Sequence, residues 1–260
     1  MATDSVISRR AGALSGWSVP LVAAVLAADA AGEATFRPQD VRFYFLLFTN
    51  WMGDDRLRPG ADVDPTQVRR TLEHLRDAGL AAGTAGRPPR WSLAPGGVVR
   101  LVDALTDPRA ARRFEEVLLL ATVAGAYSET IAARVHGGDA RRVRQRLDPR
   151  AILRAERRRL ADALVDMEAR RDAGPALAAV ARAALAEGLA PVDVAARLAV
   201  DGPPYQLHPM RPLPEVVASL PPAMARYEVE RGLERRARVL FAPLADDLRA
   251  KIAILERLEG

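Results

Sequence analysis

The chain has 260 residues, of which 49% are hydrophobic and 27% charged, and its formal net charge is +5. This composition is typical of a folded globular protein, so it excludes disordered, collagen-like and purely coiled-coil chains. The chain contains no cysteine, which excludes disulfide frameworks, thiolate metal sites and cysteine nucleophiles. Every basic residue except Lys251 and the histidines is arginine, so the high isoelectric point reflects residue usage and is weak evidence of a binding surface.

An apolar run near the N-terminus, residues 19–28, has two interpretations. Because it follows Arg9 and Arg10, it resembles a twin-arginine export signal, although Asp4 lies in the segment that should be purely basic. Leu21 and Val25 instead belong to a set at helical spacing, which predicts a buried helix. The run is shorter than the roughly 18 residues of a membrane helix, so we expect no membrane contact and a cytoplasmic protein.

Helical patterns and short breaks alternate over the first hundred residues. We predict helices over 19–31, 39–52, 64–78 and 95–105. Five aromatic residues fall in the second of these, which we expect to form the centre of the N-terminal core. Between the last two helices, residues 80–83 and 90–93 have the pattern of two strands joined by a turn rich in glycine and proline, which predicts a hairpin.

The rest of the chain is predicted to be helical. The expected helices cover 111–135, 140–147, 149–171, 176–187, 191–200 and 223–258. We expect a break at 172–175, a proline-rich connector at 202–222, and a kink or split at Pro243. Apolar residues recur through the last helix at intervals of three, four or seven, and they suit either pairing with a second copy or a core within one chain. These residues are Leu233, Leu240, Leu244, Leu248, Ile252 and Leu255.

The order helix, helix, helix, hairpin, helix is that of a winged helix-turn-helix. Residues 64–80, and then 86–97, resemble the recognition helix and wing of PadR- and MarR-type bacterial regulators, which share a leucine-spaced helix ending in Gly-Leu, a basic hairpin and an aromatic-x-Leu strand. This resemblance implies a winged-helix DNA-binding domain over 15–108, in a transcriptional regulator. Residues 109–260 are then a helical domain for dimerisation or partner binding. The connection of about eleven residues before the recognition helix departs from the usual turn of three or four.

The recognition helix predicted by this resemblance has one apolar and one polar face. If Val68, Leu72 and Leu75 point inward, the polar residues point away. Arginine pairs with guanine and glutamine with adenine, while arginines at the hairpin tip can hold phosphates or enter a narrow minor groove. The predicted DNA-binding residues are Thr66, Gln67, Arg69, Arg70, His74, Arg87 and Arg90. The alternative is a winged-helix protein-interaction subunit or scaffold of a larger complex, in which the same residues form a solvated face.

A second basic segment lies between residues 134 and 159, where ten arginines accompany three acidic residues. Such a stripe can follow phosphates. The candidate surface consists of Arg141, Arg142, Arg150, Arg154, Arg157 and Arg158. Residues 129–147 also resemble a plain helix-turn-helix, and the equally good alternative is a solvated arginine face paired with acids on the same helix.

No catalytic pattern is present. His74, His136 and His208 lie far apart without metal-ligand spacing, and the sequence contains no nucleophile elbow, Walker or Rossmann motif. We therefore expect no catalytic residues, no metal and no cofactor. The expected partners are double-stranded DNA and a second copy in a homodimer, with the C-terminal helices available to a protein partner.

Overall fold

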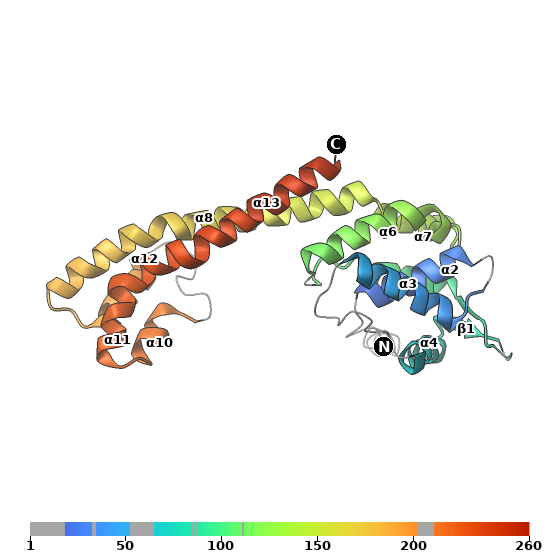
Figure 1. Ribbon diagram of the computed structural model, residues 1–260, viewed down its shortest axis with the longest axis horizontal. Coiled ribbons are helices and arrows are strands. Elements are labelled where there is room, and N and C mark those ends of the chain that lie inside the picture. The colour runs from blue at the N-terminus through green and yellow to red at the C-terminus, as the bar shows by residue number, and fades with distance from the viewer. Residues whose placement is uncertain are drawn as a thin grey trace, which may run out of the picture. The chain divides into compact units, whose positions relative to one another are not determined.

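The computed structural model describes residues 19–32, 35–52, 65–84, 86, 88–110, 112–201 and 211–259. These residues are mainly helical and contain one small two-stranded antiparallel sheet, which confirms the coarse fold class (Figure 1). The chain divides into two compact units, unit 1 (Met1–Ala155) and unit 2 (Glu156–Gly260). In the part of the chain that the structure describes, no helix combines the length and apolarity needed to span a membrane.

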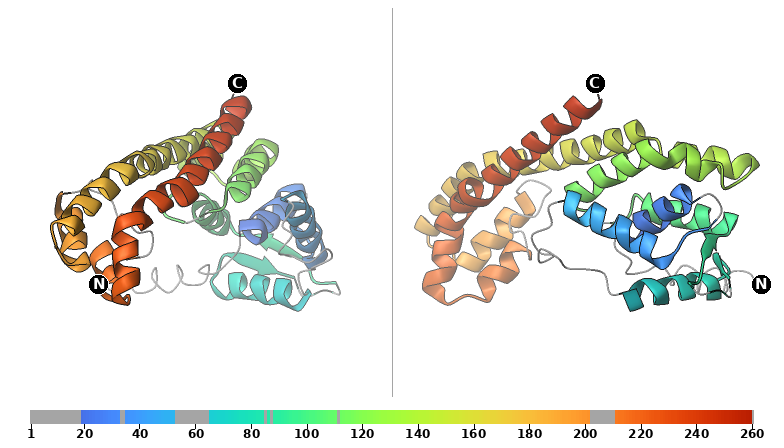
Figure 2. Two further views of the ribbon diagram at one scale, coloured as in Figure 1. Left: turned by 60° about the vertical axis from the view of Figure 1, so that its left-hand side comes forward. Right: turned by 45° about the vertical axis from the view of Figure 1, so that its right-hand side comes forward.

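The described residues of unit 1 form six helices and one hairpin, together with the first residues of α8. Figures 1 and 2 show these elements. Its elements are α2 (Val19–Ala31), α3 (Pro38–Trp51), α4 (Pro65–Asp77), β1 (Ala81–Gly83), β2 (Trp91–Leu93), α5 (Pro95–Leu105), α6 (Phe114–Ala132), α7 (Gly137–Arg146) and the start of α8 (Pro149–Ala186).

Helix α2 is the centre of unit 1. All residues from Pro20 to Ala30 are buried, and helices α3, α5 and α6 pack around them. A helix that is apolar on every side needs such a complete cover, whereas an amphipathic helix needs cover on one face only. The interpretation of the apolar N-terminal run as a buried helix is therefore confirmed.

The expectation that the aromatic helix forms this centre is wrong. Of the five aromatic residues in α3, only Phe48 is buried, while Phe43 and Trp51 are exposed. The aromatic side chains are distributed around the helix, and α3 packs on α2 with one face only. Tyr44 lies at the border of the core, where its ring meets Tyr127 edge to face with centroids 6.1 Å apart.

Helices α6 and α7 belong to unit 1, so the predicted domain boundary at residue 108 falls inside this unit. Leu119 and Val123 of α6 and Val143 of α7 are part of the same buried cluster as α2. On the surface, the Arg142 guanidinium pairs with the Asp103 carboxylate of α5 at 2.7 Å. The helical segments after residue 108 thus complete the first core before the second one begins.

Unit 2 consists of the rest of α8 and a series of shorter helices, two of which are π-helical. Its buried cluster joins α8 to α9, α10 and the segment from α11 to α12. The elements are α9 (Pro191–Asp201), α10 (Leu213–Ala218), α11 (Pro222–Tyr227), η1 (Glu228–Gly232), α12 (Leu233–Arg236), η2 (Ala237–Phe241) and α13 (Ala242–Glu259).

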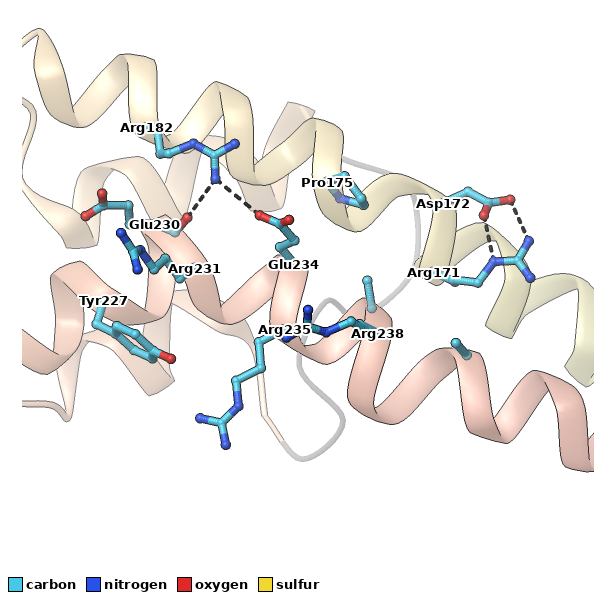
Figure 3. A pocket seen from close by; sticks show the side chains of 12 residues that line it. Arg171, Asp172, Pro175, Arg182, Tyr227, Glu230, Arg231, Glu234, Arg235 and Arg238 are labelled. Atoms are coloured by element: carbon cyan, nitrogen blue, oxygen red, sulfur yellow. Dashed lines mark hydrogen bonds and ion pairs between the residues drawn. The ribbon is translucent and has the colours of Figure 1, made fainter.

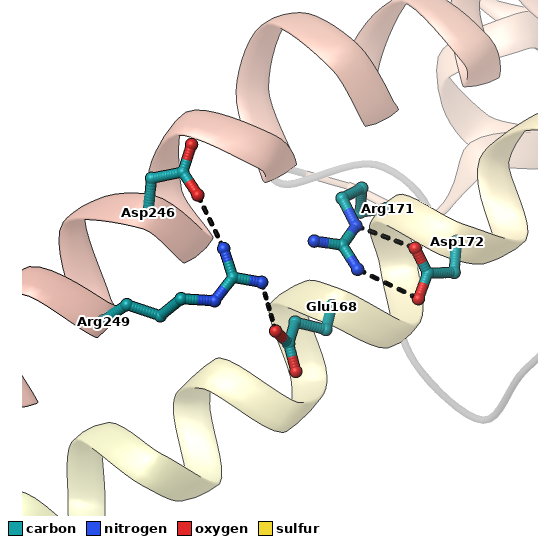
Figure 4. A network of polar contacts seen from close by, with 5 residues as sticks. All are labelled: Glu168, Arg171, Asp172, Asp246 and Arg249. Carbon is teal, nitrogen blue, oxygen red and sulfur yellow. Dashed lines mark hydrogen bonds and ion pairs between the residues drawn. The ribbon is translucent and has the colours of Figure 1, made fainter.

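Ion pairs show that α8 and the α12–α13 segment run antiparallel. Arg157 meets Glu259 at 2.9 Å, whereas Arg182, further along α8, meets Glu234 at 3.4 Å. Midway between them Arg249 of α13 reaches Glu168 of α8 and also its own neighbour Asp246, at 2.6 Å (Figure 4). The partner residue moves back along the chain as α8 advances, which is the signature of an antiparallel pair.

The predicted break at 172–175 is wrong, because α8 continues through Pro175 to Ala186. Proline removes one backbone donor and usually interrupts a helix. Here the preceding Gly174 lies directly against η2 and α12, such that a Cβ atom on it would come within 2.5 Å of the Ala237 Cβ. Close packing of two helices over this segment holds α8 together and outweighs the local preference of proline.

The expected split at Pro243 is not found, because residues 222–259 form one continuous run of α- and π-helical turns. Pro243 follows the π-helical turn η2, and Ala242 between them keeps a helical backbone conformation. The described end of the connector at 202–222 contains α10, which the sequence analysis missed. Its Leu213, Val216 and Val217 are buried, and a proline in its first turn is compatible with a helix start.

The leucine series is largely used within unit 2. Leu233 and Leu255 are buried, and Leu240, Leu248 and Ile252 are half-buried. Only Leu244 of this series is classed as exposed. Of the two uses left open by the sequence, the structure favours a core within one chain.

Candidate nucleic-acid interface

Helix α4 has the two faces that the sequence predicts. Val68, Leu72 and Leu75 are buried, and Thr71 joins them. The opposite face is exposed and polar, and its residues are Thr66, Gln67, Arg69, Arg70 and His74. Arg69 pairs with Glu73 one turn later at 2.9 Å, but both side chains face water, where such a pair contributes little. The predicted stripe is therefore confirmed, and five of the seven predicted DNA-binding side chains lie on one helix face.

The end of α4 is built by glycine. Gly79 has φ of +70°, a left-handed conformation that favours glycine. The Leu80 N–H donates to the Leu75 carbonyl at 2.8 Å, and the Gly79 N–H donates to the Arg76 carbonyl at 2.8 Å. These two bonds form a Schellman motif, which satisfies the last carbonyls of the helix and turns the chain into β1. The position of the hairpin beside α4 follows directly from this turn (Figure 1).

The hairpin pairs β1 with β2 in antiparallel register, with Ala82 opposite Ser92. At the end where the loop joins the strands, the Thr84 N–H donates to the Arg90 carbonyl at 2.8 Å. Arg90 is exposed, and its guanidinium donates to the Thr35 hydroxyl at 3.1 Å, so its head group is held near the start of α3. Arg87, the other arginine predicted to hold phosphates, lies outside the described residues.

A reciprocal backbone pair extends the hairpin toward the helices. The Phe36 N–H donates to the Trp91 carbonyl and the Trp91 N–H to the Phe36 carbonyl, both at 2.8 Å. This bridge lies in the short connection between α2 and α3, and both side chains are buried. It ties β2 to the core, so the hairpin is fixed relative to α4 as well as to α2.

Asp29 and Arg134 form a second tie between the hairpin and the helices. The Asp29 carboxylate, buried in α2, accepts the Leu93 N–H of β2 at 3.0 Å and lies 3.7 Å from the Arg134 guanidinium. Arg134, which follows α6, also donates to the Asp29 carbonyl at 2.6 Å and to the Gly32 carbonyl. Burial raises the pKa of the Asp29 carboxyl above its ordinary value, while the Leu93 N–H and the Arg134 charge act in the opposite direction.

The second basic surface is partly neutralised. Arg142 is paired with Asp103, Arg154 lies 3.9 Å from Asp148, and Arg157 is paired with Glu259. The other three predicted members, Arg141, Arg150 and Arg158, are exposed and form no ion pair with any residue in the described ranges. The acids that pair with the three paired arginines come from α5, α13 and the turn before α8. Pairing within one helix, the expected alternative, is found at Arg159 of the same segment, which meets Glu156 at 2.6 Å.

The structure brings no metal-binding group together. In the described ranges no three histidine or acidic side chains lie close enough to hold an ion, and His208 falls outside these ranges.

No protein-family model, curated protein or solved structure matches the chain.

Two sets of polar residues were missed by sequence reasoning. Arg134 and Asp29 lie 105 residues apart, and neither belongs to a recognisable motif. The other set consists of arginines around η1 and η2 in unit 2, namely Arg231, Arg235 and Arg238. Their helical spacing was visible, but acidic residues interleave with them, so no local charge excess indicated a site.

Proposed function

We propose that this chain is a cytoplasmic, sequence-specific DNA-binding regulator of transcription, in which residues 19–105 form a winged helix similar to those of PadR- and MarR-type proteins. The observation that carries the proposal is the exposed polar face of α4 beside an anchored hairpin. In this proposal α4 enters the major groove, which is wide enough for one helix. The hairpin is the wing that follows the neighbouring backbone.

The chemistry of the α4 face suits base recognition. Gln67 and Arg70 lie in the first two turns of the helix, where recognition helices reach base edges. Glutamine offers an acceptor and a donor to adenine, and arginine can form two hydrogen bonds with guanine. The ion pair between Arg69 and Glu73 leaves Arg69 exposed, so it can exchange its partner for a phosphate or a base when DNA arrives.

A double substitution on α4 tests the proposal. We expect Arg69→Ala with Arg70→Ala to weaken binding to mixed genomic duplex fragments by about thirtyfold or more, since each arginine contact contributes about 1–3 kcal/mol. Fluorescence anisotropy at two salt concentrations measures this, and wild-type binding should weaken as salt rises. Arg109→Ala, which removes an exposed arginine outside α4 and the hairpin, is the control.

The outcomes of this experiment assign the surface. Salt-sensitive binding that survives the double substitution would contradict a role for α4 and point to Arg141, Arg150 and Arg158. No binding at all would leave the chain as a protein-interaction subunit or scaffold.

One observation bears on the homodimer expected of such a regulator. The exposed large apolar residues Phe43, Leu47 and Trp51 follow each other at four-residue intervals along α3, and 61%, 48% and 52% of their surfaces are accessible. Four-residue spacing places them on one face of the helix, and contiguous exposed apolar surface marks protein contacts. A two-fold axis at Leu47 would set Phe43 against Trp51 of the partner subunit, so this face suits the homodimer expected of a regulator that reads two half-sites.

A charge placed in the middle of this face tests the dimer. We expect the wild-type chain to be a dimer and the Leu47→Asp variant to be a monomer, because the substitution would bury a carboxylate at the two-fold axis of the contact. Sedimentation velocity over a tenfold range of protein concentration measures the change. Val165→Asp, at an exposed position of α8, is the matched control. A wild-type chain that is already monomeric, or a Leu47→Asp variant that remains dimeric, would contradict this use of α3.

A further inference from the structure

A groove of about 1010 Å³ in unit 2 carries a surplus of arginine. It lies between α8 and the segment from Tyr227 to Ala242 (Figure 3). Three carboxylates line it together with five arginines. The arginines are Arg171, Arg182, Arg231, Arg235 and Arg238, and the acids are Asp172, Glu230 and Glu234.

Each carboxylate in the groove already has an arginine partner. Asp172 accepts from Arg171 at 2.7 Å, and this contact lowers the pKa of the Asp172 carboxyl. Glu234 is paired with Arg182 at 3.4 Å, as Figure 3 shows, and Glu230 lies 3.6 Å from Arg226, which is outside the groove.

The remaining arginines carry the surplus charge. Arg231, Arg235 and Arg238 are exposed and have no hydrogen-bonding or ion-pair partner within the described ranges. All three come from the one segment that includes η1, α12 and η2. The three side chains line the same groove and point in different directions in Figure 3, so an anion bound in the groove would gather charges that have no acidic partner in the described ranges.

An apolar hollow adjoins the groove. It has a volume of about 480 Å³ and shares Tyr227 and Arg235 with the groove, so these two side chains stand between the hollows. Its only other charged wall residues, Glu228 and Arg236, are paired with each other. The rest of the wall is apolar except for Gly232, and it consists of Val216, Leu220, Met224, Val239 and Leu240. Met224 and Val239 are 57% and 59% exposed, so this wall presents apolar surface to solvent.

We propose that the groove and the apolar hollow form one binding site for a phosphorylated amphiphile, a small molecule with a phosphate group joined to an apolar tail. The phosphate is held by Arg231, Arg235 and Arg238, and the tail covers the apolar wall beyond Tyr227. The site lies wholly within unit 2 and does not depend on the proposed DNA binding.

Charge and shape favour this class of ligand. A phosphate monoester carries nearly two negative charges at neutral pH and three acceptor oxygens, which match several guanidinium groups better than a single carboxylate does. Arginine presents a planar fork that binds phosphate oxygens in pairs. The hollows have the size of small-molecule sites, and both π-helical turns of unit 2 lie in their wall, as π-bulges often do at functional sites.

Calorimetric titration of the full chain tests the site. The probe is decyl phosphate, used below the concentration at which it forms micelles. Two control ligands represent its parts: inorganic phosphate represents the head group, and decanol represents the apolar tail. We expect saturable binding of one decyl phosphate per chain, with at least tenfold weaker binding of either half, because charge and apolar burial both contribute. Equal binding of inorganic phosphate would overturn the role of the apolar hollow, and no binding of decyl phosphate would overturn the site.

Surface variants locate the ligand without disturbing the fold. Arg235→Ala and Met224→Glu change exposed side chains at the two hollows, and each is expected to weaken decyl phosphate binding about tenfold or more. Arg257→Ala and Val200→Glu change exposed positions of unit 2 away from both hollows and should bind as the wild type does. Equal weakening in the control variants would overturn the assignment.

Two further measurements distinguish this small ligand from the phosphate groups of nucleic acid and of a membrane surface. A 20-base-pair duplex that displaces decyl phosphate, and that loses affinity in Arg235→Ala, would show that the groove holds nucleic acid instead. Binding to vesicles containing phosphatidic acid, without binding to monomeric decyl phosphate, would show a membrane-surface contact instead. Either result would overturn the proposal.

Discussion

Replacing Gly97 by alanine is expected to destabilise unit 1 by about 3 kcal/mol or more, because the new methyl group has no space. A Cβ atom at this position would lie 1.9 Å from the carbonyl oxygen of Leu80, a backbone atom. That oxygen also accepts the Ala94 N–H at 3.0 Å, so it cannot move without breaking the junction between β1 and α5. Urea unfolding measures the loss, and Trp17, Trp51 and Trp91 confine the fluorescence signal to unit 1, since the chain has no other tryptophan.

The neighbouring glycine provides a matched control. A Cβ atom on Gly96 would meet nothing within 4 Å, and Gly96 also lies in the first turn of α5. Gly96→Ala should therefore leave the free energy of unfolding unchanged or raise it by about 0.4–1 kcal/mol, because alanine restricts the unfolded chain. If Gly97→Ala unfolds within about 0.5 kcal/mol of the wild type, the close approach of α5 to Leu80 does not exist in solution.

This packing is part of what the sequence could not reveal. The residues around it were predictable, since Pro95 and Gly79 are local signals that mark a helix start and a helix end. The stripe of Val68, Leu72 and Leu75 was predictable for the same reason, because the period of an amphipathic helix is written into neighbouring residues. Local signals therefore located the recognition-helix candidate and its hairpin to within one or two residues.

Features that depend on distant partners were not predictable. Pro175 predicts a break by itself, but Gly174 packs on a helix some sixty residues later and α8 continues. Likewise, α3 is rich in aromatic residues, yet the small apolar residues of α2 occupy the centre because they can be covered on every side. The surplus of Arg231, Arg235 and Arg238 emerges only after Asp172 and Glu234 have been paired with arginines of α8. The sequence alone does not show which distant residues pair in this way.

The largest expected electrostatic effect concerns Arg134. We expect Arg134→Met to destabilise unit 1 by about 3 kcal/mol at pH 7.5, because it leaves the buried Asp29 carboxylate without its charged partner. Two backbone carbonyls, those of Asp29 and Gly32, also lose a donor. Urea unfolding followed by tryptophan fluorescence measures the effect. Arg144→Met is the control, since among the described residues Arg144 pairs with one exposed glutamate, Glu129, at 2.9 Å.

The pH dependence distinguishes the buried charge from simple loss of packing. The pKa of Asp29 is higher in the folded chain than its ordinary value of 3.8, so the folded state binds its proton more tightly than the unfolded state does. The contribution of Asp29 to the free energy of unfolding therefore falls as pH rises from about 4 through the folded pKa and then stays level. Removing the Arg134 charge raises this pKa further, so in Arg134→Met the fall is larger and extends to higher pH.

A second substitution completes the test. Asp29→Asn keeps an oxygen that can accept the Leu93 N–H but removes the charge, so in the Arg134→Met background it should restore part of the lost stability at pH 7.5. At pH 5 the same substitution should restore less, because protonation has by then neutralised more of the Asp29 population in Arg134→Met. If the single variant Arg134→Met and the double variant with Asp29→Asn differ in their free energy of unfolding by the same amount at pH 5 and pH 7.5, Asp29 does not titrate in this range. In that case Arg134 acts through its backbone hydrogen bonds alone. The tie between α2, β2 and the α6–α7 turn would then be a matter of hydrogen-bond geometry rather than of charge.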